Sequence, residues 1–287
     1  MSIASLESVV AVTTSSLAGC RIAVIGAGTM GSAIASGLGE AGVFSQASLT
    51  VVDVHRDVAE RLAARIEGAV TATLELAMTD ADIVLVCVKP KDVPEVLDAL
   101  ARARPSAPLP LVLSIAAGVT IASIESRLPA GAAVIRAMPN TASQIRKGCT
   151  VLSRGSHASD DDLARARTIF ESVGTCIALE ERHLDAVTAV SASGPAFIYV
   201  VLEALTDGAV SVGLPRQAAL ELVTRMTLGA AEMVLATGRH PAALKDDVTT
   251  PGGCTIAGLM VLEDGRARSV LARAIETTTR VAAGLGK

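Results

Sequence analysis

Aromatic residues are almost absent from this chain. Its 287 residues include three Phe, one Tyr and no Trp, although hydrophobic residues make up 51% of the total. A sizeable core is therefore available, but it must be built from aliphatic side chains and alanine. The net charge is −4 and the basic residues form no cluster. Because nucleic-acid binding depends on basic surfaces and often on rings that stack on bases, no nucleic-acid partner is expected.

Cysteine pairs with the spacing of a metal site are also missing. The five cysteines are dispersed, no Cys-x-x-Cys pair occurs and there are only four histidines. This pattern argues against a disulfide framework and against a metal site, and it favours a reducing, cytoplasmic location. Residues 1–19 lack a basic segment and contain Glu7, so a loose extension is predicted rather than a signal peptide. No run of ~20 apolar residues is present, so no membrane partner is expected.

From residue 21 onward, short apolar segments alternate with amphipathic ones. The predicted strands are 21–26, 48–53, 81–88, 111–116, 132–138 and 149–153, with 175–179 as an edge candidate. The predicted helices are a stretch ending at Ala41, 56–68 and 93–103. This alternation predicts an α/β fold built on a doubly wound parallel sheet.

The chain changes character near residue 180. Segments 184–213 and 214–238 are long, alanine-rich and helical in period, and no strand is expected there. We therefore predict a loose extension (1–19), a dinucleotide-binding domain (20–180) and an all-α domain (181–287). Helices that are apolar on several sides need another surface to cover them, and a second copy of the same domain is the predicted cover. A self-contained bundle is the alternative.

A glycine-rich turn follows the first predicted strand. Gly26, Gly28 and Gly31 form Gly-x-Gly-x-x-Gly between a strand and a helix, and Asp53 follows Gly31 by 22 residues. The glycines permit a tight turn and close approach of a pyrophosphate, which the amides at the helix N-terminus attract. The spacing to Asp53 is that of an acid which binds an adenosine ribose. The pattern predicts a Rossmann-type dinucleotide-binding domain.

The choice between NADH and NADPH stays open at this point. A carboxylate at Asp53 favours the free 2′-hydroxyl of NADH. His55 and Arg56 lie just beyond it and are suited to a 2′-phosphate, or they belong to a solvated loop.

Further loops leave the strands at the same edge of the predicted sheet. Lys89 and Pro90 follow the third strand, and segments 114–120 and 136–145 follow later ones. Ligands of such folds bind at the carboxyl ends of the strands, so these loops are expected to line a nicotinamide pocket. Lys89 is a candidate for catalysis, for phosphate neutralisation or for plain solvation.

A second bare loop lies near the C-terminus. Pro251, Gly252 and Gly253 precede a predicted helix that contains Thr255. Main-chain amides at a helix N-terminus bind anions without a cationic side chain, so an anion site is predicted. Thr255 is expected either to cap the helix or to point its hydroxyl at the ligand.

Five motifs, in order and spacing, resemble the Δ1-pyrroline-5-carboxylate reductase family. They are GAGTMGSAI (26–34), VKP (88–90), RAMPNT (136–141), LDAVTAVSASGPAF (184–197) and LKDDVTTPGGCT (244–255). The resemblance covers nearly everything from residue 20 onward. It implies reduction of a cyclic imine to L-proline with NADH or NADPH, and a Rossmann domain followed by a helical domain that interleaves with a partner subunit. It also implies homodimers that often gather into decamers.

The resemblance also implies roles for individual residues. Around the substrate it places Glu181, Thr250, Gly252, Gly253 and Thr255, with Thr255 at the ring nitrogen as the catalytic residue. Around the cofactor it places the glycine-loop residues Gly26, Gly28, Thr29, Met30 and Gly31. It also places there Asp53, Val88, Lys89, Pro90, Ala116, Ala117, Asp247 and Cys254. Position 247 often carries a neutral amide in the family, so Asp247 adds a charge near an anionic substrate.

Two rival functions are weaker. A 3-hydroxyacid-type dehydrogenase would need a catalytic lysine on the first helix after the nucleotide domain, and residues 184–214 contain none. A non-catalytic dinucleotide sensor would have no use for the carboxylate-binding loop.

Overall fold

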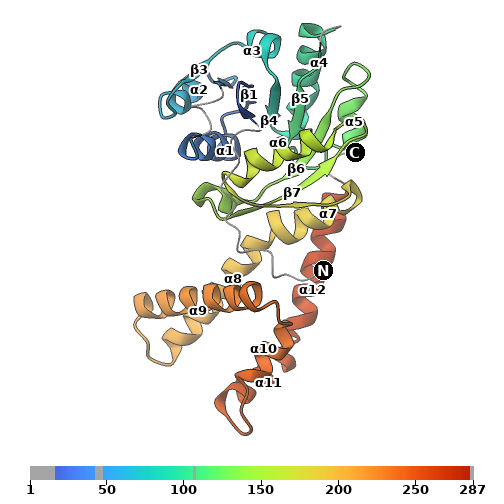
Figure 1. The fold of residues 1–287 in the computed structure, drawn as a ribbon. Coiled ribbons are helices and arrows are strands. Elements are labelled where there is room, and N and C mark those ends of the chain that lie inside the picture. Colours follow the sequence, from blue (N-terminus) through green and yellow to red (C-terminus); the bar gives the residue numbers. More distant parts are fainter. Residues whose placement is uncertain (1–16, 43–47, 106–107, 285–287) are drawn as a thin grey trace. The chain divides into compact units, whose positions relative to one another are not determined.

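The computed structural model describes residues 17–42, 48–105 and 108–284 (Figure 1). The chain divides into two compact units. We call them the sheet unit, which contains residues 17–193 and 277–284 of the described chain, and the helical unit, Gly194–Glu276.

An eight-stranded sheet forms the centre of the sheet unit. In sequence order the strands are β1 (Arg21–Ile25), β2 (Ser48–Val52), β3 (Ala69–Thr71), β4 (Ile83–Val86), β5 (Leu111–Ser114), β6 (Val134–Met138), β7 (Gly148–Arg154) and β8 (Gly174–Ala178). Their spatial order is β3-β2-β1-β4-β5-β6-β7-β8. The order reverses between β1 and β4, and the crevice at the carboxyl ends there is the usual ligand site of such sheets.

Helices cover the two faces of this sheet, and the alternation of side chains along each strand divides the core accordingly. One face packs against α1 (Thr29–Glu40), α2 (Arg56–Ala63) and α6 (Asp160–Glu171). The other packs against α3 (Leu74–Asp80), α4 (Val93–Ala103) and α5 (Ile121–Glu125). In β1, for example, Ile22 and Val24 join the first core while Ala23 and Ile25 join the second, as the two-residue period of a strand requires. Aliphatic residues dominate both cores, as the composition predicts.

The prediction of a wholly parallel sheet was wrong at one edge. β7 runs antiparallel to β6, and β8 is parallel to β7. Residues 139–147 connect β6 to β7 through the short 3-10 helix η4 (Thr141–Ile145). A parallel neighbour needs a crossover of a dozen or more residues, whereas a short connection such as this one suits an antiparallel pair. Strand β3 and helices α3, α5 and α6 were also missing from the sequence prediction.

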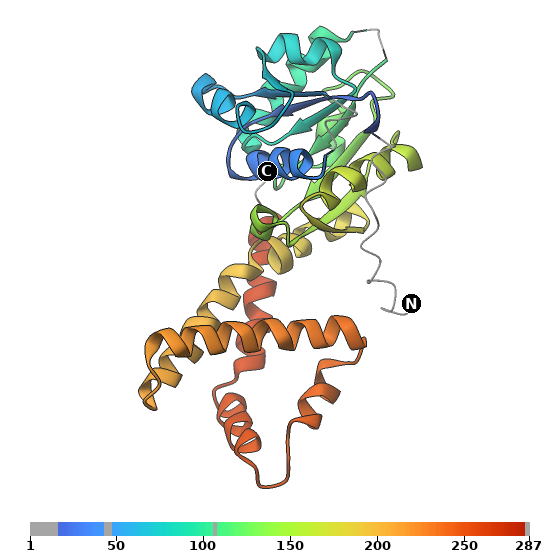
Figure 2. The same cartoon turned by 60° about the vertical axis from the view of Figure 1, so that its left-hand side comes forward.

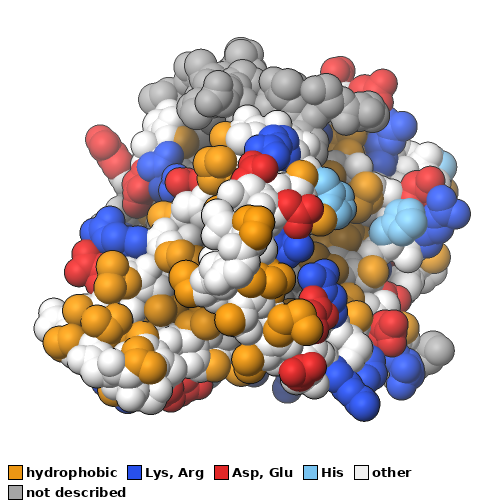
Figure 3. Space-filling view, turned by 90° about the horizontal axis from the view of Figure 1, so that it is seen from below, with side chains coloured by type: hydrophobic (Ala, Val, Ile, Leu, Met, Phe, Trp, Pro, Cys, Tyr) orange, Lys and Arg blue, Asp and Glu red, His pale blue; other side chains and the backbone are white. Residues whose placement is uncertain are grey.

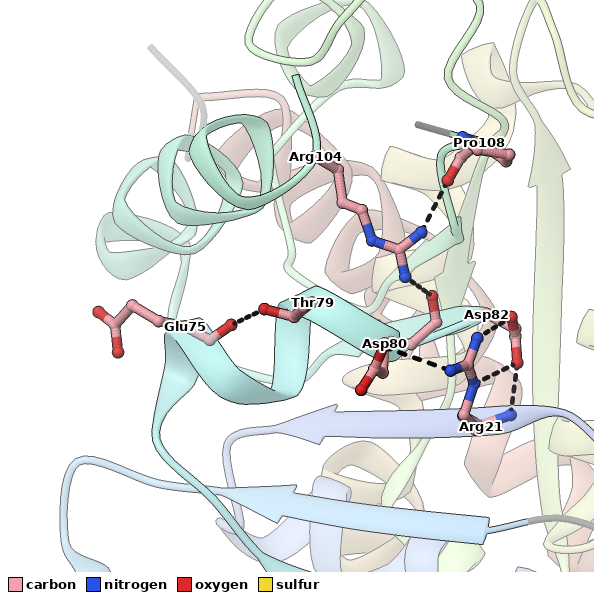
Figure 4. Close-up of polar contacts among 8 residues, drawn as sticks. Arg21, Glu75, Thr79, Asp80, Asp82, Arg104 and Pro108 are labelled. Atoms are coloured by element: carbon pink, nitrogen blue, oxygen red, sulfur yellow. Dashed lines mark hydrogen bonds and ion pairs between the residues drawn. The ribbon is translucent and has the colours of Figure 1, made fainter. Parts of the chain in front are cut away.

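Polar contacts tie the strands together at the amino edge of the sheet (Figure 4). The amide and guanidinium of Arg21, the first residue of β1, donate to both carboxylate oxygens of Asp82, which immediately precedes β4. These bonds lower the pKa of Asp82, an effect that outweighs partial desolvation. Arg104 donates to the carbonyls of Ala81 and Pro108 and so ties the segments that enter β4 and β5. The edge opposite the ligand crevice is thereby fixed.

The N-terminal extension is described only at its end. Residues 1–16 lie outside the described residues, so the predicted looseness stays a prediction for them. Leu17 is fully buried in the core that contains α1 and α6.

One helical run leads out of the sheet unit. It comprises η5 (Glu181–His183), α7 (Leu184–Val187), a π-helical segment (Thr188–Ala192) and, in the helical unit, α8 (Gly194–Ser211). By length and composition Glu181–Ser211 is the one stretch of the described chain apolar enough to cross a membrane. Charged residues interrupt this stretch, so the search of the sequence for an unbroken apolar run did not find it.

The helical unit contains α8, α9 (Arg216–Thr237), α10 (Pro241–Asp247), α11 (Cys254–Asp264) and the first part of α12 (Ala267–Ala282). No strand lies in its described residues, as predicted. Figure 2 shows the loop between α10 and α11 at a tip of this unit. Large hydrophobic side chains remain exposed on all its longer helices, and hydrophobic side chains are spread over the face in Figure 3. The exposed large hydrophobic side chains of these helices include Tyr199, Val200, Leu222, Leu228, Leu235 and Val261.

Candidate active site

The glycine loop has the geometry that a dinucleotide requires. Gly26 adopts a φ of +102°, and a Cβ there would meet the carbonyl oxygen of Cys87 at 2.8 Å. A Cβ on Gly31 would overlap the carbonyl of Gly26, so this glycine allows α1 to pack against the loop. Gly28, the N-cap of α1, faces open space. The loop is therefore crowded on its protein side and open at the helix N-terminus, where a pyrophosphate would bind.

Asp53 lies directly after β2 and holds this loop. One carboxylate oxygen accepts a hydrogen bond from the amide of Ala27 at 2.8 Å, and the other accepts from the amide of His55 at 2.9 Å. Arg56 is mostly exposed and pairs with Glu60 on its own helix. Asp53 thus sits beside the glycine loop and has a structural role, and its contact with a ribose stays a prediction.

The loops after β4 and β5 line one cavity together with residues of α4 and α5. Val88 and Lys89 follow β4, and Pro90 begins the short 3-10 helix η3 (Pro90–Asp92) that leads into α4. Together with Gly118, Val119 and Thr120, Lys89 and Pro90 line a cavity of about 590 Å³. Ala116 and Ala117 lie at the start of this second loop, with Ala116 buried.

An ion pair between a buried arginine and a partly exposed glutamate anchors the second loop. Arg136 in β6 is only 3% exposed, and its Nη1 donates to Oε1 of Glu181 at 3.0 Å. The same oxygen accepts from the amide of Ile121, the first residue of α5, at 2.7 Å. Sequence reasoning placed Glu181 at the substrate and missed Arg136. The signal was available, because a charged residue inside the apolar strand segment AAVIRAM needs a partner.

The bare loop in the helical unit is a tight turn. Thr250 accepts a hydrogen bond at its carbonyl from the amide of Gly253 at 3.0 Å, with Pro251 and Gly252 between them. Gly252 has a φ of +67°. Proline followed by a glycine with positive φ is typical of a type II turn. A Cβ on Gly253 would overlap the Thr250 hydroxyl, so a larger residue there would displace that hydroxyl.

Helix α11 begins directly after the turn, with Gly253 as its N-cap and no side-chain cap. Of the two alternatives left open for Thr255, the structure contradicts the N-cap, because Thr255 lies within the first turn. Its hydroxyl has no hydrogen-bond partner among the described residues, and neither have the amides of Cys254, Thr255 and Ile256. These donors lie in the first turn of α11, at the positive end of the helix, and the Thr250 side chain lies beside Gly253.

Asp247 ends α10, just before this turn, and it is not an isolated negative charge. Nη1 of Arg239 lies 2.6 Å from Oδ2 of Asp247. This hydrogen bond lowers the pKa of Asp247. Arg239 therefore balances the extra carboxylate that the sequence places near the anion site.

The structure thus assembles two groups of residues, each within its own unit. The glycine loop, Asp53 and the loops after β4 and β5 meet at the carboxyl edge of the sheet. Thr250, Gly252, Gly253, Cys254 and Thr255 meet at the start of α11, with Asp247 close by in the chain.

Comparison with known proteins identifies this combination. Residues 21–118 match the family model "NADP oxidoreductase coenzyme F420-dependent", and residues 181–285 match "pyrroline-5-carboxylate reductase dimerisation". The pyrroline-5-carboxylate reductase of Methanosarcina acetivorans is 39% identical over 267 residues, covering 93% of this chain and 98% of the relative. The chain belongs to the pyrroline-5-carboxylate reductase family.

Two solved reductases have the same fold. A pyrroline-5-carboxylate reductase from Coxiella burnetii matches with a TM-score of 0.86 at 32% identity, covering 93% of this chain and 99% of its own. The NADP-bound pyrroline carboxylate reductase of Plasmodium falciparum matches with a TM-score of 0.80 at 26% identity, covering 93% and 98%.

Family membership confirms the predicted fold class, a Rossmann-type dinucleotide-binding domain followed by an all-α dimerisation domain. It also confirms that the chain is an NAD(P)H-dependent oxidoreductase that self-associates. The exposed apolar helices of the helical unit lie within the dimerisation match, so a partner subunit is the predicted cover for their surface.

Proposed function

We propose that this reductase converts Δ1-pyrroline-5-carboxylate to L-proline, the last step of proline biosynthesis, and that the turn Thr250–Gly253 with the start of α11 holds the substrate. The observation that carries this assignment is the set of unpaired amides and the unpaired Thr255 hydroxyl at one helix N-terminus. Carboxylates are favoured there by the helix dipole and by hydrogen bonds to the free amides. We also propose that the helical domain begins at residue 181, where the match to the dimerisation family begins.

The sheet unit fits a reduced nicotinamide dinucleotide. Gly28 leaves open space at the N-terminus of α1, where Thr29, Met30 and Gly31 present first-turn amides to a pyrophosphate. Asp53 is placed for the adenosine ribose. Val88, Lys89, Pro90, Ala116 and Ala117 line the nicotinamide end. When bound, the cofactor supplies the hydride.

The protein's task is then mainly one of positioning. A protonated imine is already electrophilic, so reduction needs its carbon held about 3–3.5 Å from the hydride donor rather than a strong acid. The first-turn amides of α11, with Thr250, Gly252 and Gly253, fix the substrate carboxylate. The Thr255 hydroxyl accepts a hydrogen bond from the protonated ring nitrogen and so orients the ring. Asp247 and Cys254 lie at the edge of this pocket.

A direct assay tests the assignment. Purified protein is mixed with pyrroline-5-carboxylate and either NADPH or NADH, and the loss of reduced-nicotinamide absorbance is followed. We expect turnover with at least one cofactor and formation of L-proline. A protein that binds the cofactor but never oxidises it would be a sensor, and the proposal would be abandoned.

We further propose that the active species is a homodimer with its active site near the subunit boundary, and that dimers gather into decamers. The enzyme is proposed to work in the cytoplasm, without nucleic-acid or membrane partners. The exposed apolar helices support the homodimer, and the five free cysteines support a reducing, cytoplasmic location. Sedimentation analysis coupled to the assay is the test, and a fully active monomer would contradict it.

A further inference from the structure

We propose that Arg136 is a positioning residue for the nicotinamide pocket, which it controls through Glu181 and the main chain of the loop after β5. The inference rests on the proposed function, since that function makes this loop a wall of the cofactor site.

Arg136 belongs to a row of buried polar side chains that crosses three neighbouring strands. Ser114 in β5 and Ser153 in β7 are its partners in register, and all three are at least 97% buried. Residues paired in this way share one face of the sheet. On its own strand Arg136 stands between the buried Val134 and Met138. A charged group in this apolar position needs a specific reason.

Each member of the row holds a different piece of main chain near the carboxyl edge. The Ser114 hydroxyl accepts from the amide of Ala116 at 3.4 Å, and the Ser153 hydroxyl donates to the carbonyl of Leu179 at 2.8 Å. Arg136 acts through Glu181, whose Oε1 bonds the amide of Ile121. The loop from Ala116 to Ile121 is thus tied at its start by Ser114 and at its end by Glu181.

Stability alone is a poor explanation for the pair. Nε and Nη2 of Arg136 are buried and have no partner in the described chain. Burying the Arg136 guanidinium with two unsatisfied donors costs desolvation that its attraction to the partly exposed Glu181 repays poorly, and apolar replacement of buried pairs is often neutral or stabilising. What an apolar pair cannot supply is the acceptor for Ile121, and this acceptor fixes the end of the loop that lines the cavity with Lys89 and Pro90.

Three variants separate positioning from stability. Arg136→Met leaves Glu181 unpaired, and we expect the thermal midpoint to fall and the KM for reduced cofactor to rise about tenfold. Arg136→Met with Glu181→Gln keeps an amide oxygen for Ile121 without an unpaired charge. The cofactor KM should then return to within about twofold of wild type, and the thermal midpoint to within a few degrees. Arg136→Met with Glu181→Leu is apolar throughout, so the midpoint should recover while the cofactor KM stays raised.

Arg104→Met is the matched control. Arg104 is a partly buried arginine that also has an unpartnered Nε and holds main-chain carbonyls, but at the amino edge (Figure 4). We expect it to lower the thermal midpoint without changing the cofactor KM. In Arg104→Met the KM for pyrroline-5-carboxylate should also stay within about twofold of wild type.

A wild-type cofactor KM in the Arg136→Met, Glu181→Leu protein would overturn the positioning role. The same comparison is made with dissociation constants from fluorescence titration of the reduced cofactor. If wild-type enzyme did not turn over pyrroline-5-carboxylate, the proposed function would fail, and the titration would still decide the role of Arg136.

Discussion

The carboxylate of Asp53 and the amide of Ala27 are joined by a 2.8 Å hydrogen bond, so the residue after β2 holds the main chain of the glycine loop. The same carboxylate is the group that would meet the adenosine ribose. Its charge and its hydrogen bond to the loop are separable, because an asparagine retains an oxygen that can accept from Ala27.

Asp53→Asn should therefore shift cofactor preference while the bond to Ala27 is kept, although the amide of His55 loses its acceptor. Removing the negative charge removes repulsion of a 2′-phosphate, and it weakens the hydrogen bond to a free 2′-hydroxyl. We expect the ratio of kcat/KM for NADPH to kcat/KM for NADH to rise about tenfold. Asp57→Asn, which removes a nearby exposed carboxylate paired with Arg61, is the control and should leave the ratio unchanged. An unaltered ratio in Asp53→Asn would remove Asp53 from cofactor recognition.

Thr255→Ala should lower kcat/KM for pyrroline-5-carboxylate by about tenfold or more, because a hydrogen bond to the ring nitrogen is lost. Thr255→Ser retains the hydroxyl and should keep most of the activity. Thr249→Ala is a control on the same segment, since the Thr249 hydroxyl is already bonded to the carbonyl of Lys245. Equal turnover by Thr255→Ala and wild type would reject the role given to Thr255.

The sequence predicted the architecture well where period and turn chemistry agree. Strands β1, β2, β4, β5 and β6 are short, mainly apolar segments at a spacing that allows intervening helices, and all were predicted. Helix α6 was missed although Ser159 and Asp162 form a capping box that marks its start. The direction of β7 could not be derived from hydrophobicity, because a buried strand has the same composition in either orientation.

The site was predictable in part for a similar reason. The glycine loop and the 250–253 turn depend on residues close together in the chain, so their spacing alone indicates their shape. The Arg136–Glu181 pair joins residues 45 positions apart. Only the folded sheet brings such residues together, and sequence reasoning assigned Glu181 without its partner.

Gly253→Ala should damage substrate binding more than folding. The added methyl would displace the Thr250 hydroxyl beside the proposed carboxylate site. We expect the KM for pyrroline-5-carboxylate to rise about tenfold while the KM for the cofactor stays unchanged. Gly258→Ala in the same helix meets no atom within 4 Å and is the matched control. If both substitutions left the substrate KM alone, the turn would not be the carboxylate site.

Cys254 should be the most reactive thiol of the chain. It is exposed at the start of α11, whereas burial raises the pKa of Cys87 and raises that of Cys176 to about 12. A maleimide should therefore modify Cys254 first, as mass spectrometry would show, and block substrate binding. Cys254→Ser should resist inactivation, and L-proline should slow it in the wild type. Rapid labelling with full retention of activity would place Cys254 away from the pocket.

Arg239 should keep the substrate site electrostatically neutral around Asp247. The hydrogen bond from Arg239 lowers the pKa of Asp247, with their mutual attraction acting in the same direction, so the carboxylate stays ionised and paired throughout the neutral range. In Arg239→Met the unpaired charge lies close in the chain to the carboxylate site, and the KM for pyrroline-5-carboxylate should rise about threefold at low ionic strength. Adding Asp247→Asn should restore the wild-type KM, because it removes the charge that Arg239 balances.

The same ion pair predicts a pH dependence of stability. A carboxyl group whose pKa is lower in the folded protein stabilises the fold at any pH above its pKa in the unfolded chain. The contribution of the ion pair to the free energy of unfolding should therefore be lost only as the pH falls through the lowered pKa of Asp247 in the folded protein. Thermal midpoints of wild type and Arg239→Met should therefore converge only in acid. If neither Arg239→Met nor the added Asp247→Asn changed the KM for pyrroline-5-carboxylate, Asp247 would lie too far from the substrate to affect its binding.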